Sequence, residues 1–155
     1  METIAGTSSS QQAGIDSEVM ARLAGPWHLV TIEQPDANGV MGALKVAGFL
    51  VLTPDGHMTI QVRNMESFDL DNPYSSGGYE ASYGTLTLDP ANSTFVYHVE
   101  GALVQALVGQ DLPRSYRFVD DRLILTSTRA DEEWRVVWRR SGNDSLKPPA
   151  RGFQR

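Results

Sequence analysis

The stretch RLAGPWHLVTIE, from Arg22 to Glu33, decides how the rest of the chain is interpreted. It carries a Gly-x-Trp, ending at Trp27, at the start of a run in which apolar and polar residues alternate, the period of a half-buried β-strand. In front of it, DSEVMARLAG predicts one short helix with Asp16 or Ser17 as N-cap. A helix that leads into such a strand raises a question of fold. Trp27 either plugs the floor of a closed barrel or is an ordinary buried aromatic.

Strand-like runs separated by turn residues follow Trp27. The Asp-Gly of PDGH and the short separators DD and RAD are typical of antiparallel hairpins. Eight short strands with local connections predict an all-β fold, an eight-stranded antiparallel up-and-down β-barrel with a short N-terminal helix, whose closure removes exposed edges. A two-sheet sandwich is the alternative, because its strands are also apolar on one side. The eight predicted strands are residues 27–33, 48–53, 58–64, 83–89, 94–101, 113–120, 122–128 and 133–140.

The length and the ends of the chain predict one folded unit between two arms. With 155 residues, the chain is long enough for one domain with a sizeable core. Residues 1–16 are rich in Ser, Gln, Gly and Thr, and we expect a flexible N-terminal arm there. Residues 17–140 are the expected barrel domain. Residues 141–155 combine Gly, Pro and basic residues, which predicts a flexible C-terminal tail.

Charge and cysteine content exclude several classes of function. With 19 acidic and 13 basic residues, the formal net charge is -6, so we expect no nucleic-acid partner. The absence of cysteine excludes disulfides, thiolate metal sites and cysteine nucleophiles. The first residues lack the basic and apolar regions of a secretory signal, and no apolar stretch is long enough to span a bilayer. We therefore expect a cytoplasmic protein without a membrane partner.

Five stretches of the chain resemble one family in their order and spacing. They are LAGPWHLVTIE, GFLVLTPDGHMTIQV, SYGTLTLD, FVYHVEG and PRSYRFVDDRLILTST, and they cover most of residues 23–140. The chain thereby resembles the lipocalin-like domain family, small intracellular bacterial and fungal proteins with a calycin-type β-barrel. The resemblance implies a pocket for an apolar or amphipathic small molecule. It also implies that Arg139 or Arg140 packs over Trp27 as a closing arginine.

The chain departs from the secreted lipocalins, which argues against extracellular transport. It lacks their Thr-Asp-Tyr turn, their cysteine pair and their signal peptide. Within the wider barrel class some proteins only bind ligands, whereas others resemble cyclases, isomerases or pericyclases of natural-product pathways. The resemblance in fold does not choose between these activities, because function lies in the site rather than in the scaffold.

His98 and Glu100 are the first pair of candidate catalytic residues. Two positions apart on a strand, they share a face, so an imidazole and a carboxylate lie side by side as a general acid/base pair. The resemblance favours the histidine, because His-Val-Glu on this strand is similar to the family's pattern. The alternative is that this face points to solvent while Phe95, Tyr97 and Val99 point inward.

Arg114 and Tyr116 are the second pair of candidate catalytic residues. They also share a face, and they offer a cation and a phenol to a carbonyl, enolate or carboxylate. The alternative is an exposed arginine beside a half-buried tyrosine. Tyr83 is a candidate for substrate binding, because the glycine after it allows a ligand to approach the backbone closely. Its alternative is a core aromatic with the hydroxyl at the rim.

Strict alternation assigns further side chains to the interior. If Trp27 points inward, so do Leu29, Thr31 and Glu33. A carboxylate inside is costly without a partner, so Glu33 is expected at the barrel mouth or in a pair. On the strand at 58–64 the apolar face is expected inside, and it consists of Met58, Ile60 and Val62.

Two apolar loops are suited to gate such an interior. Residues 65–78 carry apolar side chains among turn formers, and residues 102–109 are apolar enough to lie across the barrel mouth as a short helix. Loops of this kind either seal a core or close over a ligand. The substrate-binding residues that we predict are Tyr83, Trp27, Met58, Ile60, Phe68 and Trp138.

We expect neither a metal nor a cofactor. The three histidines have no metal-ligand spacing, and no phosphate-binding loop or serine nucleophile elbow is present. We therefore expect a cofactor-independent cyclase or isomerase, with dehydratase and pericyclase activities as variants. Its substrate is expected to be a hydrophobic intermediate of natural-product biosynthesis, bound in the barrel lumen. The alternatives are a non-catalytic carrier of a hydrophobic small molecule and a filled barrel that binds a protein partner or forms a homodimer.

Overall fold

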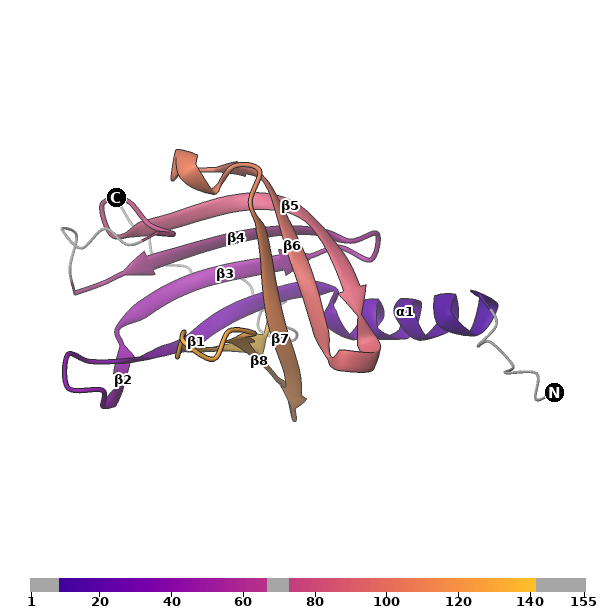
Figure 1. Ribbon diagram of the computed structural model, residues 1–155, viewed down its shortest axis with the longest axis horizontal. Coiled ribbons are helices and arrows are strands. Elements are labelled where there is room, and N and C mark those ends of the chain that lie inside the picture. Colours follow the sequence, from indigo (N-terminus) through magenta and orange to yellow (C-terminus); the bar gives the residue numbers. More distant parts are fainter. Residues whose placement is uncertain (1–8, 67–72, 142–155) are drawn as a thin grey trace, which may run out of the picture.

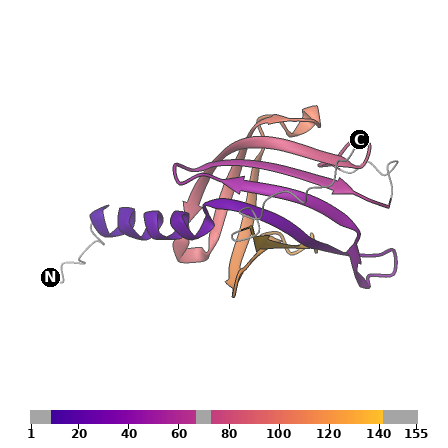
Figure 2. The ribbon, with the colours of Figure 1, turned by 180° about the vertical axis from the view of Figure 1, so that it is seen from behind.

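The protein is a closed antiparallel barrel with a helix at one end (Figure 1). The computed structural model describes residues 9–66 and 73–141. The strand order in the sheet is β2-β1-β3-β4-β5-β6-β7-β8-β9, so β1 lies between β2 and β3, and β1 also pairs with β9, which closes the sheet. Figures 1 and 2 show the curved sheet from opposite sides. The elements are α1 (Ser9–Leu23), β1 (Gly25–Pro35), β2 (Met41–Leu44), β3 (Val46–Leu52), β4 (His57–Asn64), β5 (Tyr79–Asp89), β6 (Thr94–Ala102), β7 (Asp111–Val119), β8 (Arg122–Ser127) and β9 (Arg135–Arg140), with the 3₁₀ turns η1 (Pro90–Asn92) and η2 (Gln105–Leu107).

The predicted eight-stranded all-β barrel is confirmed, with β2 as one extra strand. β2 pairs with the end of β1, between Ile32 and Pro35. The turn between them forms at Asp36, whose carboxylate accepts hydrogen bonds from the backbone N–H of Asn38 at 2.8 Å and of Val40 at 2.9 Å. β2 is short and mostly exposed. Its sequence therefore lacks the apolar alternation that indicated the other strands.

Helix α1 begins earlier than the sequence pattern indicated. It starts at Ser9 rather than at Asp16 or Ser17, so residues 9–16, predicted as part of a flexible arm, are helical. Figure 1 shows that this part of α1 extends away from the barrel. Because this part of the helix does not pack on the barrel, its sequence lacks the apolar stripe that indicates a helix. Of the predicted arms, residues 1–8 and 142–155 lie outside the described residues, whereas Ser141 is buried, its hydroxyl 2.5 Å from Nδ1 of His28.

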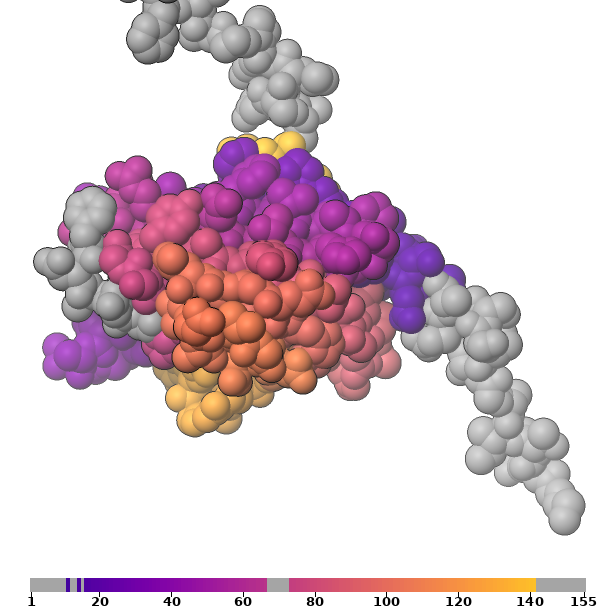
Figure 3. Space-filling view, turned by 90° about the horizontal axis from the view of Figure 1, so that it is seen from above, coloured from indigo at the N-terminus to yellow at the C-terminus, as the bar shows by residue number. Residues whose placement is uncertain are grey.

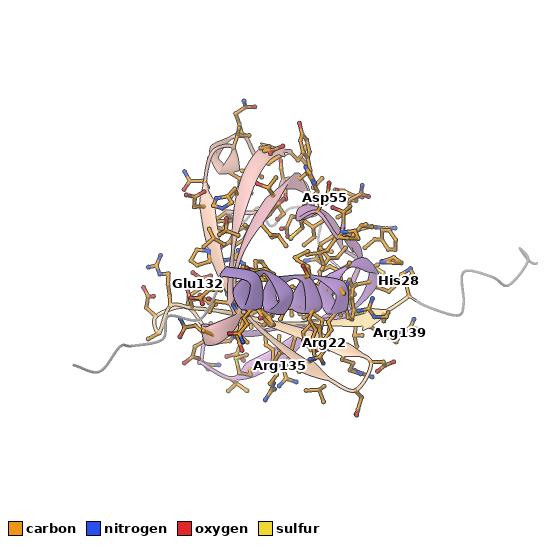
Figure 4. The ribbon with its side chains drawn as sticks, turned by 90° about the vertical axis from the view of Figure 1, so that its right-hand side faces the viewer. Arg22, His28, Asp55, Glu132, Arg135 and Arg139 are labelled. Carbon is orange, nitrogen blue, oxygen red and sulfur yellow. The ribbon has the colours of Figure 1, made fainter. Side chains whose placement is uncertain are left out.

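Trp27 closes the end of the barrel next to α1, which Figure 4 views from the α1 side. Its side chain is buried, and its Nε1 donates a hydrogen bond to the carbonyl of Leu23 at 2.8 Å. The guanidinium of Arg140 lies 4.1 Å from the centroid of the Trp27 ring. The same guanidinium donates to the carbonyl of Ala24 at 2.7 Å and to that of Arg22. Of the two arginines that the resemblance implies for this position, Arg140 occupies it.

A β-bulge at Val30 corrects the predicted orientation of the second half of β1. The register with β9 shifts between Leu29 and Thr31, so one extra residue stands on β1. Beyond the bulge, Ile32 packs against the core, while Glu33 pairs with Arg135 of β9 at 3.0 Å. The prediction that Thr31 and Glu33 share the inward face of Trp27 is therefore wrong, because strict alternation fails at an inserted residue.

The interior is apolar along most of its length. Met58 and Val62 of β4 are buried and Ile60 packs against them in the core, which confirms their predicted inward face. In the connection between β6 and β7, η2 places Leu107 in the same core. The backbone N–H of Leu103 donates to the carbonyl of Ala81 at 2.8 Å, which holds this connection against β5 (orange beside pink in Figure 3).

Candidate ligand site in the barrel

Polar side chains gather inside the barrel at its mouth, the end opposite α1. They come from three adjacent strands: Glu80 and Ser82 from β5, Tyr97 from β6 and Arg114 from β7. Tyr97 and Ser82 are buried, and Glu80 and Arg114 are partly buried. Because each of them alternates with residues of the outer face, all four point into the same interior. We define these four residues as the mouth site.

Arg114 lies between two aromatic rings. Its guanidinium carbon is 4.8 Å from the centroid of the Trp134 ring and 5.6 Å from that of Tyr74. Both distances are within the range of cation–π attraction. Nη1 donates to the carbonyl of Pro113 at 3.0 Å. Within residues 9–66 and 73–141, no carboxylate lies close enough to form an ion pair with Arg114.

Tyr97 is held as a neutral phenol between the other members of the site. Its hydroxyl donates a hydrogen bond to Oγ of Ser82 at 2.8 Å. Burial, which disfavours the phenolate, raises the pKa of Tyr97 to about 12, although the bond to Ser82 acts in the opposite direction. The charges of Glu80 and Arg114 both act on this hydroxyl, the first raising its pKa and the second lowering it. Tyr97 therefore lies within the electrostatic reach of both groups.

Glu80 is a carboxyl group in a low-dielectric environment. Burial raises the pKa of Glu80 to about 7, and the positive charge of Arg114 only partly opposes this effect. In the part of the chain that the structure describes, neither a hydrogen bond nor an ion pair holds its carboxyl oxygens. The raised pKa makes both the acid and the carboxylate accessible near neutral pH.

The predicted pair of Arg114 and Tyr116 does share the inner face of β7, but the two side chains lie at different depths. Tyr116 is buried toward the α1 end. Its ring stacks on Phe95 at a centroid distance of 6.2 Å and meets the edge of Phe118 at 5.8 Å. The structure thus brings Arg114, and not Tyr116, to the mouth site.

His98 lies on the outer face of β6, as the alternative interpretation of this strand required. Its Nδ1 is 2.6 Å from Oδ1 of Asp111 and its Nε2 is 2.7 Å from Oγ1 of Thr87. Both ring nitrogens are occupied, so the predicted pairing with Glu100 is not formed. Phe95, Tyr97 and Val99 occupy the inner face instead. The acid/base role of His98 stays a prediction, and on this geometry it would operate outside the barrel.

A second β-bulge separates Glu100 from His98. The register between β5 and β6 shifts after Tyr83, which leaves Glu100 as the extra residue. Glu100 and Tyr83 line a shallow hollow of about 170 Å³ on the outer surface, together with Thr59. Tyr83 is 57% exposed, and a Cβ added at Gly101 would lie 2.4 Å from its ring. The ring therefore covers the glycine and faces solvent rather than the lumen.

The remaining predicted substrate-binding residues are divided between the core and the loops. Trp27, Met58, Ile60 and Trp138 line or pack against the interior. Trp138 is fully buried, and its Nε1 has no hydrogen-bond partner among the described residues. Phe68 lies outside the described residues.

The pattern did not indicate Glu80 and Ser82 as site residues. The sequence pattern predicts the start of their strand at Tyr83, whereas β5 begins at Tyr79. A signal was present: Leu86 and Leu88 share the inner face, and extending the period of two backward places Ser82 and Glu80 on it.

The family model of the lipocalin-like domain matches residues 24–141 of the chain. The chain belongs to this family. The match covers the whole barrel, and a lipocalin-like barrel suggests small-molecule binding. No curated protein matches the chain. Among the residues that the structure describes, no helix is long and apolar enough to cross a membrane, and no three His, Asp or Glu side chains are grouped to hold a metal ion.

Proposed function

We propose that this lipocalin-like protein binds an amphipathic small molecule at the mouth site and rearranges it without a cofactor, as a cyclase or isomerase. The apolar body of the molecule packs on the core, and an oxygen-bearing group lies on Arg114. The observation that carries the proposal is Arg114 itself, a cation inside the barrel that has no carboxylate partner among the described residues.

A partly buried guanidinium is costly unless an acceptor satisfies it. The aromatic rings of Trp134 and Tyr74 attract the cation but do not neutralise its charge. A carboxylate, sulfonate, enolate or polarised carbonyl of a ligand supplies the missing acceptor. The indole N–H of Trp138 is a second donor without an acceptor among residues 9–66 and 73–141. The interior therefore offers a ligand an apolar surface and the guanidinium of Arg114, whereas the Trp138 indole is fully buried in the core.

A rearrangement is the reaction that we propose, because it can be accelerated mainly by holding the substrate in a reactive conformation. A shaped apolar lumen that holds a flexible molecule in a reactive conformation accounts for about 7 to 11 kcal/mol of a barrier in favourable systems. Few polar groups are then needed. We propose a hydrophobic intermediate of natural-product biosynthesis as the substrate, and we extend the proposal to dehydratase and pericyclase chemistry, which uses the same features.

The test of binding compares an anionic and a neutral apolar probe. 1-Anilinonaphthalene-8-sulfonate and N-phenyl-1-naphthylamine share their apolar body, and only the first carries a sulfonate. We expect one-to-one binding of the anionic probe that weakens about tenfold or more in Arg114→Met, since hydrogen bonds to charged groups contribute about 1.5 to 3 kcal/mol. Arg117→Met, on the exposed outer face of β7, is the matched control. Equal affinity of both probes for wild type and Arg114→Met contradicts the proposal.

The test of reaction is product analysis. Polyketide-like and terpenoid compounds that bind are incubated with the protein and examined for a changed product, of unchanged mass for a cyclase, isomerase or pericyclase and lighter by one water for a dehydratase. Recovery of every bound compound unaltered favours the non-catalytic carrier. The proposal also retains a cytoplasmic protein and a homodimer, which fractionation and light scattering test.

A further inference from the structure

We infer that Glu80 is the group that exchanges a proton with the bound molecule, and that the substrates are enolisable carbonyl compounds with an apolar body. This inference rests on the proposed function, because it assigns the carbonyl oxygen to Arg114. It adds a reacting group and a substrate class.

The placement of Glu80 is the first support. It lies on the inner face of β5 at the mouth, one inward position from Ser82. Oγ of Ser82 accepts a hydrogen bond from the hydroxyl of Tyr97 on the next strand. The charges of Glu80 and Arg114 both act on the Tyr97 hydroxyl. The carboxyl and the guanidinium therefore lie on the same inner wall, within electrostatic reach of one hydroxyl, without forming an ion pair. A ligand that binds Arg114 at the mouth would then lie close to Glu80.

The second support is that the described residues leave the carboxyl of Glu80 without a partner. Because this carboxyl is only partly buried, its oxygens stay available to a ligand, and carboxyl groups with a raised pKa gather at functional sites. The groups that face it are Tyr97 from β6 and Arg114 from β7, whereas the paired residue on β4 is the apolar Val62. Among the described residues, Tyr74 lies beside Arg114, and the charge of Glu100 also acts on Tyr97.

The electrostatics suit proton exchange near neutral pH. Burial raises the pKa of Glu80 to about 7, and Arg114 is too distant to restore an ordinary value. A direct ion pair would hold the carboxylate ionised and make it a weak base. The separation instead leaves a base whose pKa is close to the working pH, where general acid/base catalysis is most effective.

The proposed isomerisation uses only the side chains of Glu80 and Arg114. The carboxylate of Glu80 removes a proton from the carbon next to the carbonyl, and the electron pair of that C–H bond forms a C=C bond. The carbonyl π electrons move to oxygen, and the guanidinium of Arg114 stabilises the resulting enolate. Where the substrate carries a C=C bond between its β and γ carbons, the enolate is a dienolate, and Glu80 returns the proton to the γ carbon, so that the C=C bond moves into conjugation with the carbonyl. The product is an isomer, and no oxidant or reductant is consumed.

The first experiment measures proton removal with 5-nitrobenzisoxazole. A carboxylate takes its ring C–H proton while the N–O bond breaks, and a coloured nitrophenolate forms. We expect the wild-type rate to rise with pH, with a midpoint near 7, because the carboxylate is the active form. Glu80→Gln is expected to lower the rate about 100-fold or more, the size of a general-base contribution. Glu80→Asp keeps a carboxylate and is expected to retain an intermediate rate.

Glu66→Gln is the matched control, because Glu66 is an exposed carboxylate beyond the end of β4 that pairs with Lys45 at 3.3 Å. It is expected to leave the rate and its pH midpoint unchanged. The second experiment follows exchange of the α-protons of 2-tetralone for deuterium by NMR. Exchange that depends on both Glu80 and Arg114 supports enolisable carbonyl compounds as the class.

The outcomes separate the two proposals. Arg114-dependent binding of the anionic probe, with proton transfer unchanged in folded Glu80→Gln, overturns the role of Glu80 and leaves the proposed function standing. A wild type that binds the probe but transfers protons no faster than buffer overturns it as well. If Glu80→Gln does not fold, a wild-type rate without a pH midpoint near 7 is decisive against it. Absence of any probe binding removes both proposals.

Discussion

The two ends of the barrel solve opposite problems with similar residues. At the α1 end, a tryptophan and an arginine are stacked and both donate to backbone carbonyls: Trp27 donates to one, and Arg140 donates to two. At the mouth, Trp134 and Arg114 are also stacked, yet Arg114 has no acceptor beyond Pro113 among the described residues. A tryptophan–arginine pair thus closes one end of the barrel, whereas the pair at the other end keeps donors that a ligand can use. Residual polar capacity inside a barrel marks the end where a ligand belongs.

The largest expected effect falls at the closed end. Trp27→Ala removes a fully buried indole together with its hydrogen bond to Leu23, and we expect a loss of about 3 to 5 kcal/mol in the free energy of unfolding. Trp134→Ala, at the partly buried mouth, is expected to cost less than half of that. Urea denaturation followed by circular dichroism measures both. Equal losses would remove the distinction between the two ends.

The carboxyl of Glu80 is expected to make stability depend on pH. Its pKa is about 7 in the folded protein and near the ordinary 4.5 when unfolded. The protonated carboxyl therefore makes its full contribution to the free energy of unfolding below pH 4.5, and this contribution is lost as the pH rises through 7. We expect Glu80→Gln to match wild type at pH 4.5 and to exceed it at pH 8 by on the order of 3 kcal/mol. Denaturation midpoints at the two pH values measure the difference, with Glu66→Gln as control. A wild type more stable than Glu80→Gln at pH 8 would contradict a destabilising buried charge.

The two stacked arginines are expected to differ when each is replaced by methionine. Arg140→Met loses two hydrogen bonds to carbonyls and the contact with Trp27, and we expect a loss of about 1 to 2 kcal/mol. Arg114→Met removes a cation without an ionic partner and is expected to leave stability unchanged or slightly raised. Thermal unfolding compares the two variants under one condition. A larger loss in Arg114→Met would mean that the mouth cation serves the fold rather than a ligand.

The sequence predicted the barrel well because alternation is a local property. Met58, Ile60 and Val62 point inward as expected, since no bulge interrupts β4. The predictions failed at inserted residues. The bulge at Val30 turned Glu33 away from the face of Trp27, and the bulge at Glu100 separated it from His98. A bulge depends on the partner strand, and a single strand carries no sign of it.

The mouth site was harder to predict because its residues meet only through the pairing of strands. The pattern of its own strand indicates Arg114, whereas Glu80 is distant in sequence and lies in a part of β5 that precedes the predicted strand. The partner of His98 was missed for the same reason. Asp111 stands opposite it in the register between β6 and β7, while Glu100 is only its neighbour in sequence.

The smallest expected effect concerns His98, on the outer side of the wall that carries Tyr97 inside. Its imidazole joins Thr87 to Asp111 on the surface, where the carboxylate is exposed. Exposed pairs of this kind contribute up to about 1 kcal/mol, so His98→Ala is expected to change unfolding by no more than that. It is also expected to leave probe binding and proton transfer at the mouth within tenfold of wild type, because the side chain points away from Arg114. A loss of about 100-fold in a folded His98→Ala would assign the chemistry to the outer face and return His98 to the acid/base role that the sequence first suggested.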